Sequence, residues 1–340
     1  MSRVFLHPSL RIISKKSSTH KFRWLSTVHE INELLPEKKD IDTSKPFIIR
    51  NHAQTPSQTS TTISISKWFT NHEKFPKFTD YLNQHLHFTL PYELILPTTQ
   101  EYDTNPINPI KRFISWLSST QQQPNHYTLV SVLLQQEINN LNKTNNNNHL
   151  RFLRFDAPFA LLSAALEYNS LFPDLPLTEL YIAQAPLSNL PAALQADLST
   201  PKSLLSYLGK GDIYGSSIWI GLEPTYTPWH RDPNPNLFCQ LRRTKVMRLM
   251  PPNRGRSLFE RVQAGLQGTT SWRIRGEEMM QGEERQALFK AVWEEESKKG
   301  IMTEVVLSEG DVLYLPKGWW HSVRTLGSGC LNMSVNWWFR

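Results

Sequence analysis

The second half of the chain consists of short strand-like runs separated by turn residues, and this pattern restricts the fold more than any other feature. The runs are bounded by Gly and Pro turns, which interrupt regular structure. They cover residues 179–184, 216–223, 236–241, 244–250, 303–307, 311–315, 320–324 and 331–338. Many short strands with few helices between them are typical of a β-sandwich or barrel. We therefore predict a mainly β core.

Helices are expected ahead of this core and in one long insert within it. Residues 158–171 favour a helix, and so does Pro109–Leu117, whose apolar residues are spaced to bury one face. The insert, residues 253–302, contains a charged amphipathic helix at Glu283–Lys299. The expected organisation is a leader at 1–29, a support region of strands and helices at 30–175, and a core at 176–340 that carries the helical insert.

The positive charge of the chain is concentrated in its leader. The formal net charge is +7, and residues 1–29 contain no acidic residue but six basic ones: Arg3, Arg11, Lys15, Lys16, Lys21 and Arg23. The rest of the chain is therefore close to neutral, which weakens the case for broad binding to nucleic-acid phosphates. A basic, Ser-rich leader without acids is typical of a mitochondrial transit peptide, so we expect a matrix protein. The alternative is a basic tail on a cytosolic or nuclear protein.

Two further features exclude classes of protein. No stretch approaches the roughly 20 apolar residues that cross a bilayer, so we expect no membrane insertion. The two cysteines, Cys239 and Cys330, both lie in apolar strand-like runs. They are too few for a disulfide framework and are expected to be buried free thiols.

The run TPWHRD, residues 227–232, carries the first chemical motif. Alternate residues of a strand point to the same face, so His230 and Asp232 can direct an imidazole and a carboxylate at one point. One further histidine would complete the two-His, one-carboxylate set of non-haem Fe(II) oxygenases. With 11 histidines in the chain, a His-x-Asp match alone is weak; the alternative is a surface histidine beside an aspartate.

A second histidine follows a buried strand and a turn. The run GDVLYLPKGWWHSV, residues 310–323, places His321 at the start of another strand. Strands that are distant in sequence lie side by side in an antiparallel barrel, so His321 could face the same cavity as His230. The alternative is a packed core or interface residue, because two tryptophans precede it.

Together the two segments resemble the JmjC family, and within it the small hydroxylases typified by factor-inhibiting-HIF. The run TPWHRDPNPNLFCQLRRTKVMRLMPP is similar to the family pattern T-P-x-H-x-D-x3-N-x3-Q-x4-K-x5-P-P, and GDVLYLPKGWWHSV to G-D-x-L-[FY]-[IL]-P-x-x-W-[WY]-H. The resemblance covers residues 176–338 well and 45–175 more loosely. It implies a double-stranded β-helix of the cupin or jelly-roll type, one Fe(II), and 2-oxoglutarate and O2 as co-substrates.

The resemblance also implies a role for individual residues. The iron ligands would be His230, Asp232 and His321. The residues that hold 2-oxoglutarate or line the cavity near it would be Lys245, Thr227, Tyr181 (in a Y-x-x-Q strand), Asn236 and Asn336. Gln184 and Trp320 are weaker predictions for the substrate mouth.

Strand alternation supports the role of Lys245 independently. It alternates with Met247 and Leu249, which puts its ammonium on an otherwise apolar inward face. Such a charge is costly to bury unless a carboxylate neutralises it, and a dicarboxylate co-substrate would do so. The alternative is a surface lysine on an edge strand.

The function that these residues favour is an Fe(II)- and 2-oxoglutarate-dependent oxygenase that hydroxylates a protein side chain. Hydroxylation of a tRNA or RNA base is the first alternative, which the near-neutral body disfavours. Lysine demethylation ranks below both. A cupin-like binding protein without catalysis would not need the complete ligand set, and a Zn(II) hydrolase would leave Lys245 unexplained.

Overall fold

The computed structural model describes residues 28–31, 41–50, 66–70, 74–97, 102, 108–119, 125–144, 151–198, 200–266, 282–295 and 302–340. Nearly all of the expected transit peptide therefore lies outside the described residues. None of the described helices is long and apolar enough to span a bilayer. Cys239 and Cys330 are both buried and are not disulfide-bonded, as predicted.

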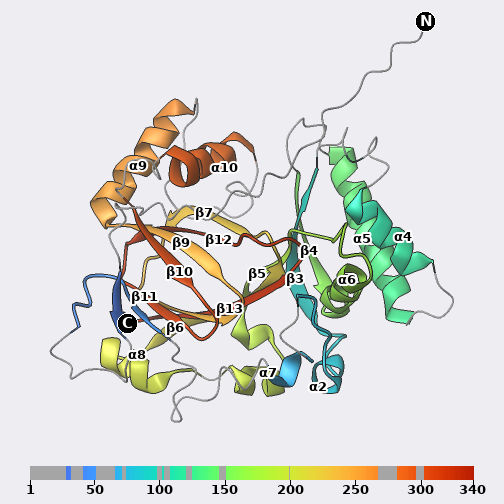
Figure 1. Ribbon diagram of the computed structural model, residues 1–340, viewed down its shortest axis with the longest axis horizontal. Helices are drawn as coiled ribbons and strands as arrows, with labels where there is room; N and C mark the ends of the chain where they lie inside the picture. Colours follow the sequence, from blue (N-terminus) through green and yellow to red (C-terminus); the bar gives the residue numbers. More distant parts are fainter. Residues whose placement is uncertain are drawn as a thin grey trace, which may run out of the picture.

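Two β-sheets form the centre of the molecule (Figure 1). In the larger sheet the described strands follow the order β1-β2-β11-β8-β13-β6-β5-β3-β4, and in the smaller one β10-β9-β12-β7. Neighbouring strands are antiparallel except for β1 and β2. Strands that are consecutive in sequence alternate between the two sheets (β6 to β7, β8 to β9, β10 to β11, β12 to β13), which is the arrangement of a jelly roll.

The strands have the following bounds: β1 His29–Ile31, β2 Phe47–Ile49, β3 Thr89–Leu96, β4 Arg151–Pro158, β5 Leu180–Pro186, β6 Ile213–Leu222, β7 Tyr226–Arg231, β8 Asn236–Arg242, β9 Lys245–Met250, β10 Thr303–Leu307, β11 Val312–Leu315, β12 Trp320–Arg324 and β13 Leu331–Phe339. The predicted mainly β jelly-roll core with flanking helices is thus confirmed. Strands β2, β3 and β4, from the N-terminal region, extend the larger sheet on both sides of the barrel.

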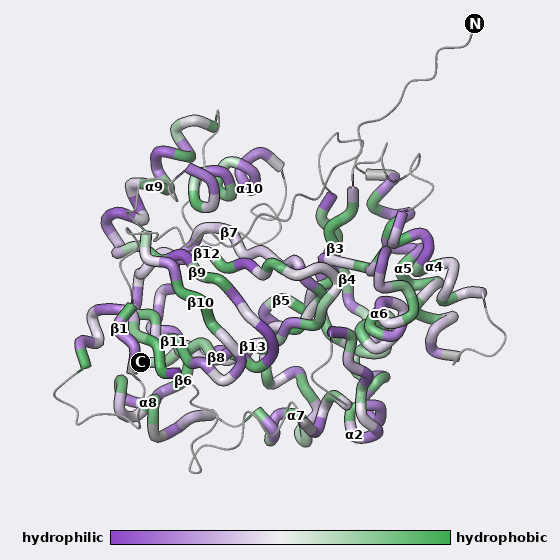
Figure 2. Tube along the Cα trace, in the orientation of Figure 1, coloured by the Kyte–Doolittle hydropathy of each residue, from purple (hydrophilic) through white to green (hydrophobic). Residues whose placement is uncertain are grey.

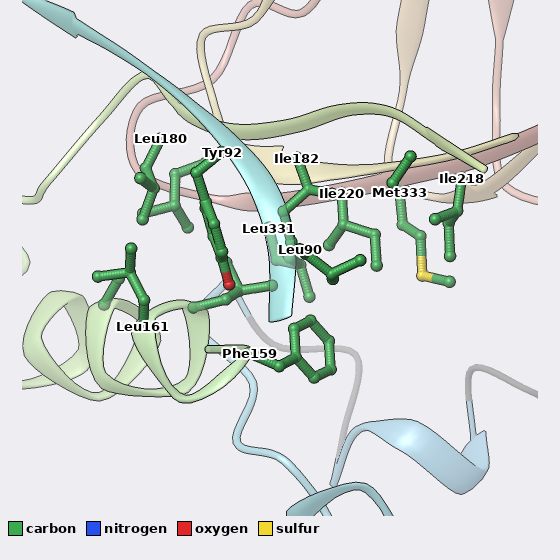
Figure 3. Packing of buried hydrophobic residues seen from close by; sticks show 14 of the residues in the cluster. Leu90, Tyr92, Phe159, Leu161, Leu180, Ile182, Ile218, Ile220, Leu331 and Met333 are labelled. Carbon is green, nitrogen blue, oxygen red and sulfur yellow. The ribbon is translucent and has the colours of Figure 1, made fainter. Parts of the chain in front are cut away.

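A layer of helices covers the β3–β4 end of the larger sheet (Figure 1). It consists of α4 (Pro109–Ser118), α5 (Asn125–Thr144) and α6 (Ala160–Leu171). Three shorter helices lie along the lower edge of the molecule in Figure 1: α2 (Asp80–Asn83), α7 (Ala192–Asp197) and α8 (Lys202–Leu208). A 3-10 turn, η2 (Leu187–Asn189), precedes α7. Helix α4 buries the four apolar residues that its spacing predicts. Leu90 and Tyr92 of β3 pack between Leu161 of α6 and Ile182 of β5 in one continuous core (Figure 3). Apolar segments follow these inner faces, and polar residues follow the outer helix surfaces (Figure 2).

The described part of the predicted insert is helical and covers the outer face of the smaller sheet. It contains α9 (Pro252–Gly265), α10 (Gly282–Phe289) and a π-helical turn, η4 (Lys290–Glu295). Phe259 of α9 and Val292 of η4 pack with Trp229 of β7 and Trp320 of β12 in a separate apolar cluster. The insert therefore lies on the side of β7 and β12 that faces away from the barrel interior.

Gly255→Ala is expected to lower the free energy of unfolding by about 1–3 kcal/mol, the usual cost of overpacking. A Cβ atom at Gly255 of α9 would lie 2.3 Å from Cγ and 2.4 Å from Cβ of Trp320, so the helix would have to move off the sheet. Gly265→Ala in the same helix is the matched control, because its Cβ would meet nothing within 4 Å. Urea unfolding measures both variants; equal stabilities would contradict this packing.

Candidate active site

Strands β7 and β12 bring the three predicted ligands together. His230 and His321 are directly opposite each other in the antiparallel pairing, and their ring centroids are 4.1 Å apart. Asp232 follows β7 immediately, with Oδ1 4.0 Å from Nε2 of His230 and Oδ2 3.8 Å from Nε2 of His321. The ligand atoms all lie within 4.8 Å of one another. Within the described part of the chain, this is the one His/Cys/Asp/Glu cluster that could hold a metal ion.

Hydrogen bonds to the backbone orient both imidazoles toward the shared point. Nδ1 of His230 lies 2.8 Å from the carbonyl oxygen of Pro228, and Nδ1 of His321 lies 3.2 Å from that of Trp319. A carbonyl only accepts, so Nδ1 carries the proton and Nε2 keeps its lone pair for a metal. Burial lowers the pKa of His321 to about 4, which keeps its ring neutral. Two neutral imidazoles and one carboxylate fit Fe(II) with open positions.

A chain of amide hydrogen bonds orients the carboxylate. Nδ2 of Asn236 donates to Oδ2 of Asp232 at 2.9 Å. Nδ2 of Asn336 donates to Oδ1 of Asn236 at 3.1 Å, and the indole N–H of Trp219 donates to Oδ1 of Asn336 at 2.8 Å. Each amide therefore has its oxygen and nitrogen assigned by a neighbour. The structure places Asn236 against the carboxylate and Asn336 behind Asn236, and it adds Trp219, which the sequence did not indicate.

Strand β7 contains a β-bulge at Pro228. His321 pairs with His230 and Val323 with Thr227, so Ser322 alone opposes two residues, Pro228 and Trp229. Thr227 and His230 are three residues apart and would face opposite sides of a regular strand. With Pro228 as the extra residue, Thr227 and His230 both line the cavity, and Trp229 packs against the insert on the outer face. A proline has no N–H to lose from the ladder, which suits it to this position.

Lys245 of β9 lies inside the barrel and is 1% exposed. Its Nζ donates to Oγ of Ser334 at 2.6 Å and to the hydroxyl of Tyr181 at 3.2 Å. The rings of Tyr181, Trp219 and Phe238 surround it at 5.3–6.0 Å. Among the described residues, no carboxylate lies within ion-pair distance of Nζ. The ammonium is held by neutral groups, which favours a bound anion as its partner.

One cavity joins the two ends of the site. All eight residues predicted for the site line it: Tyr181, Thr227, His230, Asp232, Asn236, Lys245, His321 and Asn336. Its apolar walls come from Phe238, Met247, Leu315 and Val323. The cavity has a polar site at each end and apolar walls between them, as a small bound diacid requires.

Two weaker predictions for the mouth differ in outcome. Gln184 lines the cavity, with a φ of +53° at an irregularity in the β5–β6 pairing. Trp320 does not, so that prediction is wrong: its ring lies on the outer face of the smaller sheet, 5.2 Å from that of Phe259. Strand alternation explains this, because Trp320 is adjacent to His321 and must point the other way.

Comparison with known proteins agrees with this geometry. Residues 36–340 match the family described as the cupin-like domain. Lysine-specific demethylase JMJ30 of Arabidopsis thaliana is 29% identical over 167 residues, which are 48% of this chain and 34% of that protein. Lysine-specific demethylase 8 of Danio rerio is 29% identical over 161 residues, 47% of this chain and 36% of that protein. Jumonji C domain-containing protein 5 of Drosophila melanogaster is 30% identical over 162 residues, 47% and 36% of the two chains.

The match extends over about a third of the length of each of these relatives. The narrower resemblance to the factor-inhibiting-HIF-like hydroxylases stays a prediction. The match to the cupin-like domain covers most of the chain, and the relatives are JmjC proteins, which are typically Fe(II)- and 2-oxoglutarate-dependent oxygenases. The chain therefore belongs to the cupin-like JmjC family.

Proposed function

We propose that the protein is an Fe(II)- and 2-oxoglutarate-dependent oxygenase that hydroxylates a side chain of a protein substrate. One observation carries this proposal: a convergent two-His, one-carboxylate cluster and a buried ammonium, which has no carboxylate partner among the described residues, line the same cavity. A metal hydrolase would need the cluster but not the ammonium. A diacid that bridges the two accounts for both.

The residues of the chain would act by binding, orienting and excluding water. His230, Asp232 and His321 would hold Fe(II) and leave coordination positions open. Lys245, with the hydroxyls of Tyr181 and Thr227, would fix the distal carboxylate of 2-oxoglutarate. When bound, Fe(II) with 2-oxoglutarate and O2 supplies an oxidant able to break a C–H bond. The apolar walls keep water from this region.

Lysine demethylation is the second candidate, because two of the relatives are named lysine-specific demethylases. Both reactions begin with oxidation of a C–H bond. Hydroxylation adds one oxygen atom to the substrate, whereas demethylation removes a methyl group and releases formaldehyde. Mass spectrometry of proteins treated with the enzyme separates the two outcomes. An oxidised RNA base as the product would overturn both protein proposals.

The reaction class is tested by turnover of labelled 2-oxoglutarate with Fe(II), ascorbate and air. We expect succinate from the wild type and none above background from His230→Ala. His29→Ala is a matched control, since His29 is exposed and lies in β1. A wild type that binds Fe(II) but makes no succinate, with or without added protein extract, would favour a binding protein instead.

The affinity for 2-oxoglutarate is expected to fall as the pH rises above about 7. Burial lowers the pKa of Lys245 to about 7 from its ordinary value of 10.5, and the charge of Glu223 opposes this only in part. Below this pH the free protein already carries the ammonium; above it, binding must take up a proton, which costs about tenfold in affinity per pH unit. Burial raises the pKa of Tyr181, so its hydroxyl stays protonated.

This dependence is measured as the dissociation constant of labelled 2-oxoglutarate by equilibrium dialysis with Mn(II). The Lys245→Met profile should be flat over the same range. A flat profile for the wild type would show that Lys245 keeps its proton in the free protein.

Gly221→Ala is expected to weaken 2-oxoglutarate binding roughly tenfold through overpacking. Gly221 of β6 is opposite Tyr181, and a Cβ there would lie 2.4 Å from Cδ2 and 2.9 Å from Cα of Tyr181. The added atom would also lie 2.6 Å from the backbone oxygen of Leu180, so β5 and the ring of Tyr181 beside Lys245 would have to shift. Gly215→Ala in the same strand is the control, since its Cβ would meet only a ring carbon of Trp338 at 3.6 Å. Equal affinities in the dialysis assay would contradict this role of Gly221.

We also propose that residues 1–29 direct the protein to the mitochondrial matrix. The support is the leader's composition, with six basic residues and no acidic one. Fusion of residues 1–29 to a fluorescent protein is expected to label mitochondria, and replacement of Arg3, Arg11, Lys15 and Lys16 by Gln to abolish the labelling. A cytosolic or nuclear signal from the unaltered fusion would overturn this proposal.

A further inference from the structure

We propose that Ser322 and Trp293 are positioning residues through which the helical insert holds Thr227 in the cavity and so sets the affinity for the diacid co-substrate. This inference rests on the proposed function. It concerns residues on the outer face of the smaller sheet, outside the cavity lining. It also gives the insert a part in co-substrate binding.

The bulge at Pro228 creates a structural need that the β-ladder cannot meet by itself. Because two residues of β7 oppose the single residue Ser322, the regular hydrogen-bond pattern is interrupted at this point. Without the extra residue, strand alternation would turn Thr227 away from the face that His230 occupies. Contacts that stabilise the bulge therefore decide whether the Thr227 hydroxyl faces the cavity.

Ser322 supplies the missing link with its side chain. Its hydroxyl donates to the backbone oxygen of Thr227 at 2.8 Å. Because that single proton is used, Ser322 Oγ acts as an acceptor toward the indole N–H of Trp293, 3.0 Å away. Ser322 is fully buried, so water cannot replace either bond. These two bonds thus form a relay that runs from Trp293 through Ser322 to Thr227, and the hydroxyl of Tyr226 also interacts with Ser322.

The insert holds Trp293 firmly in this position. Trp293 lies in the π-helical turn η4, and the guanidinium carbons of Arg248 and Arg324 lie 4.6 and 4.2 Å from its ring centroid. Nη1 of Arg248 donates to the backbone oxygen of Val292 at 2.6 Å, which ties η4 to strand β9. π-Helical turns are rare and cost stability, and they frequently occur at functional positions.

A second contact from the insert holds the other side of the bulge. The indole N–H of Trp229 donates to the backbone oxygen of Gly255 in α9 at 3.2 Å. Trp229 follows Pro228 directly and is fully buried. The insert thus contacts the residues on both sides of Pro228. Helix α9 accepts a hydrogen bond from Trp229, and η4 is linked to the carbonyl of Thr227 through Ser322.

The test is the dissociation constant of labelled 2-oxoglutarate, measured by equilibrium dialysis with Mn(II) on the full chain. Ser322→Ala removes the hydroxyl that donates to the part-buried Thr227 carbonyl, and we expect roughly tenfold weaker binding. Trp293→Phe keeps a ring in contact with the two arginines but removes the N–H, and we expect about threefold weaker binding. Trp337→Phe is the control, because Trp337 is 1% exposed and its indole N–H has no hydrogen-bond partner in the part of the chain that the structure describes. We expect its affinity to stay within about twofold of the wild type.

A mutant cycle separates positioning from general destabilisation. In a Thr227→Val background, which lacks the hydroxyl, Ser322→Ala should weaken binding no further. Equal weakening by Ser322→Ala in both backgrounds, or wild-type affinity of Ser322→Ala itself, would overturn the inference. Ser322→Thr, which retains a hydroxyl, should restore most of the affinity. If the wild type binds no 2-oxoglutarate, both the proposed function and this inference are wrong.

Discussion

Lys245→Met should raise the dissociation constant for 2-oxoglutarate about 100-fold and leave the protein folded. The ammonium is 1% exposed, and its hydrogen-bond partners are two hydroxyls, those of Ser334 and Tyr181. In the complex it would face a buried carboxylate. Removal of one partner of such a buried charge pair costs about 2–5 kcal/mol, mostly because the other charge is left unpaired.

The same substitution should have the opposite effect on the stability of the free protein. Without a diacid, the buried ammonium is desolvated and no carboxylate of the described residues neutralises it. Met has nearly the same length and fits the apolar face that Met247 shares. The free energy of unfolding should therefore stay the same or rise by up to about 4 kcal/mol.

Dialysis and urea unfolding test the two effects separately. Lys202→Met is the matched control, because Lys202 is exposed in α8, and both quantities should stay at their wild-type values. If Lys245→Met binds 2-oxoglutarate as tightly as the wild type does, the diacid does not bind at Lys245. A less stable Lys245→Met protein would mean that the ammonium supports the fold.

Asp232→Ala should reduce succinate formation at least about 1000-fold, since several kcal/mol of transition-state stabilisation depend on the metal. It removes the only anionic donor of the cluster. Asn236→Ala retains that carboxylate but removes the hydrogen bond from Asn236, and an effect of about 10–100-fold is expected. We therefore expect the rate of succinate formation to be lowest in Asp232→Ala, intermediate in Asn236→Ala and highest in the wild type.

Two measurements check this series. Fe(II) binding by dialysis should fall in parallel with succinate formation. Asp212→Ala is the control: its exposed carboxylate pairs with Arg340 on the surface, and such pairs contribute at most about 1 kcal/mol. Wild-type turnover by Asp232→Ala would refute the metal site.

Most of the barrel could be predicted from the sequence because its strands are short, alternating and separated by turns. The predicted run 236–241 corresponds to β8 (Asn236–Arg242), and the run 331–338 corresponds to β13 (Leu331–Phe339). Strand β3 (Thr89–Leu96) was not predicted, although its buried residues alternate regularly, because Pro91 interrupts it. Helix α5 (Asn125–Thr144) was also missed, since its Asn- and Gln-rich sequence has only a weak apolar face and the helix depends on packing.

The positions of some site residues could likewise be predicted from the sequence, and those of others could not. Alternation alone places His230 and Asp232 on one face, and the structure does so. Alternation would place Thr227 on the opposite face, and only the family resemblance pointed to it; the bulge at Pro228 resolves the conflict. A proline inside a strand was the available signal. The contact between Trp293 and Ser322 joins segments 29 residues apart across that bulge, and no local pattern encodes it.

The most direct test of the account is a crystal structure of the protein loaded with Fe(II) and 2-oxoglutarate without oxygen, with iron located by anomalous scattering. The account predicts one iron peak at about 2.0–2.2 Å from Nε2 of His230, Nε2 of His321 and a carboxylate oxygen of Asp232. It also predicts the distal carboxylate of 2-oxoglutarate on Nζ of Lys245. Iron elsewhere, or Nζ without a carboxylate in the loaded protein, would contradict it.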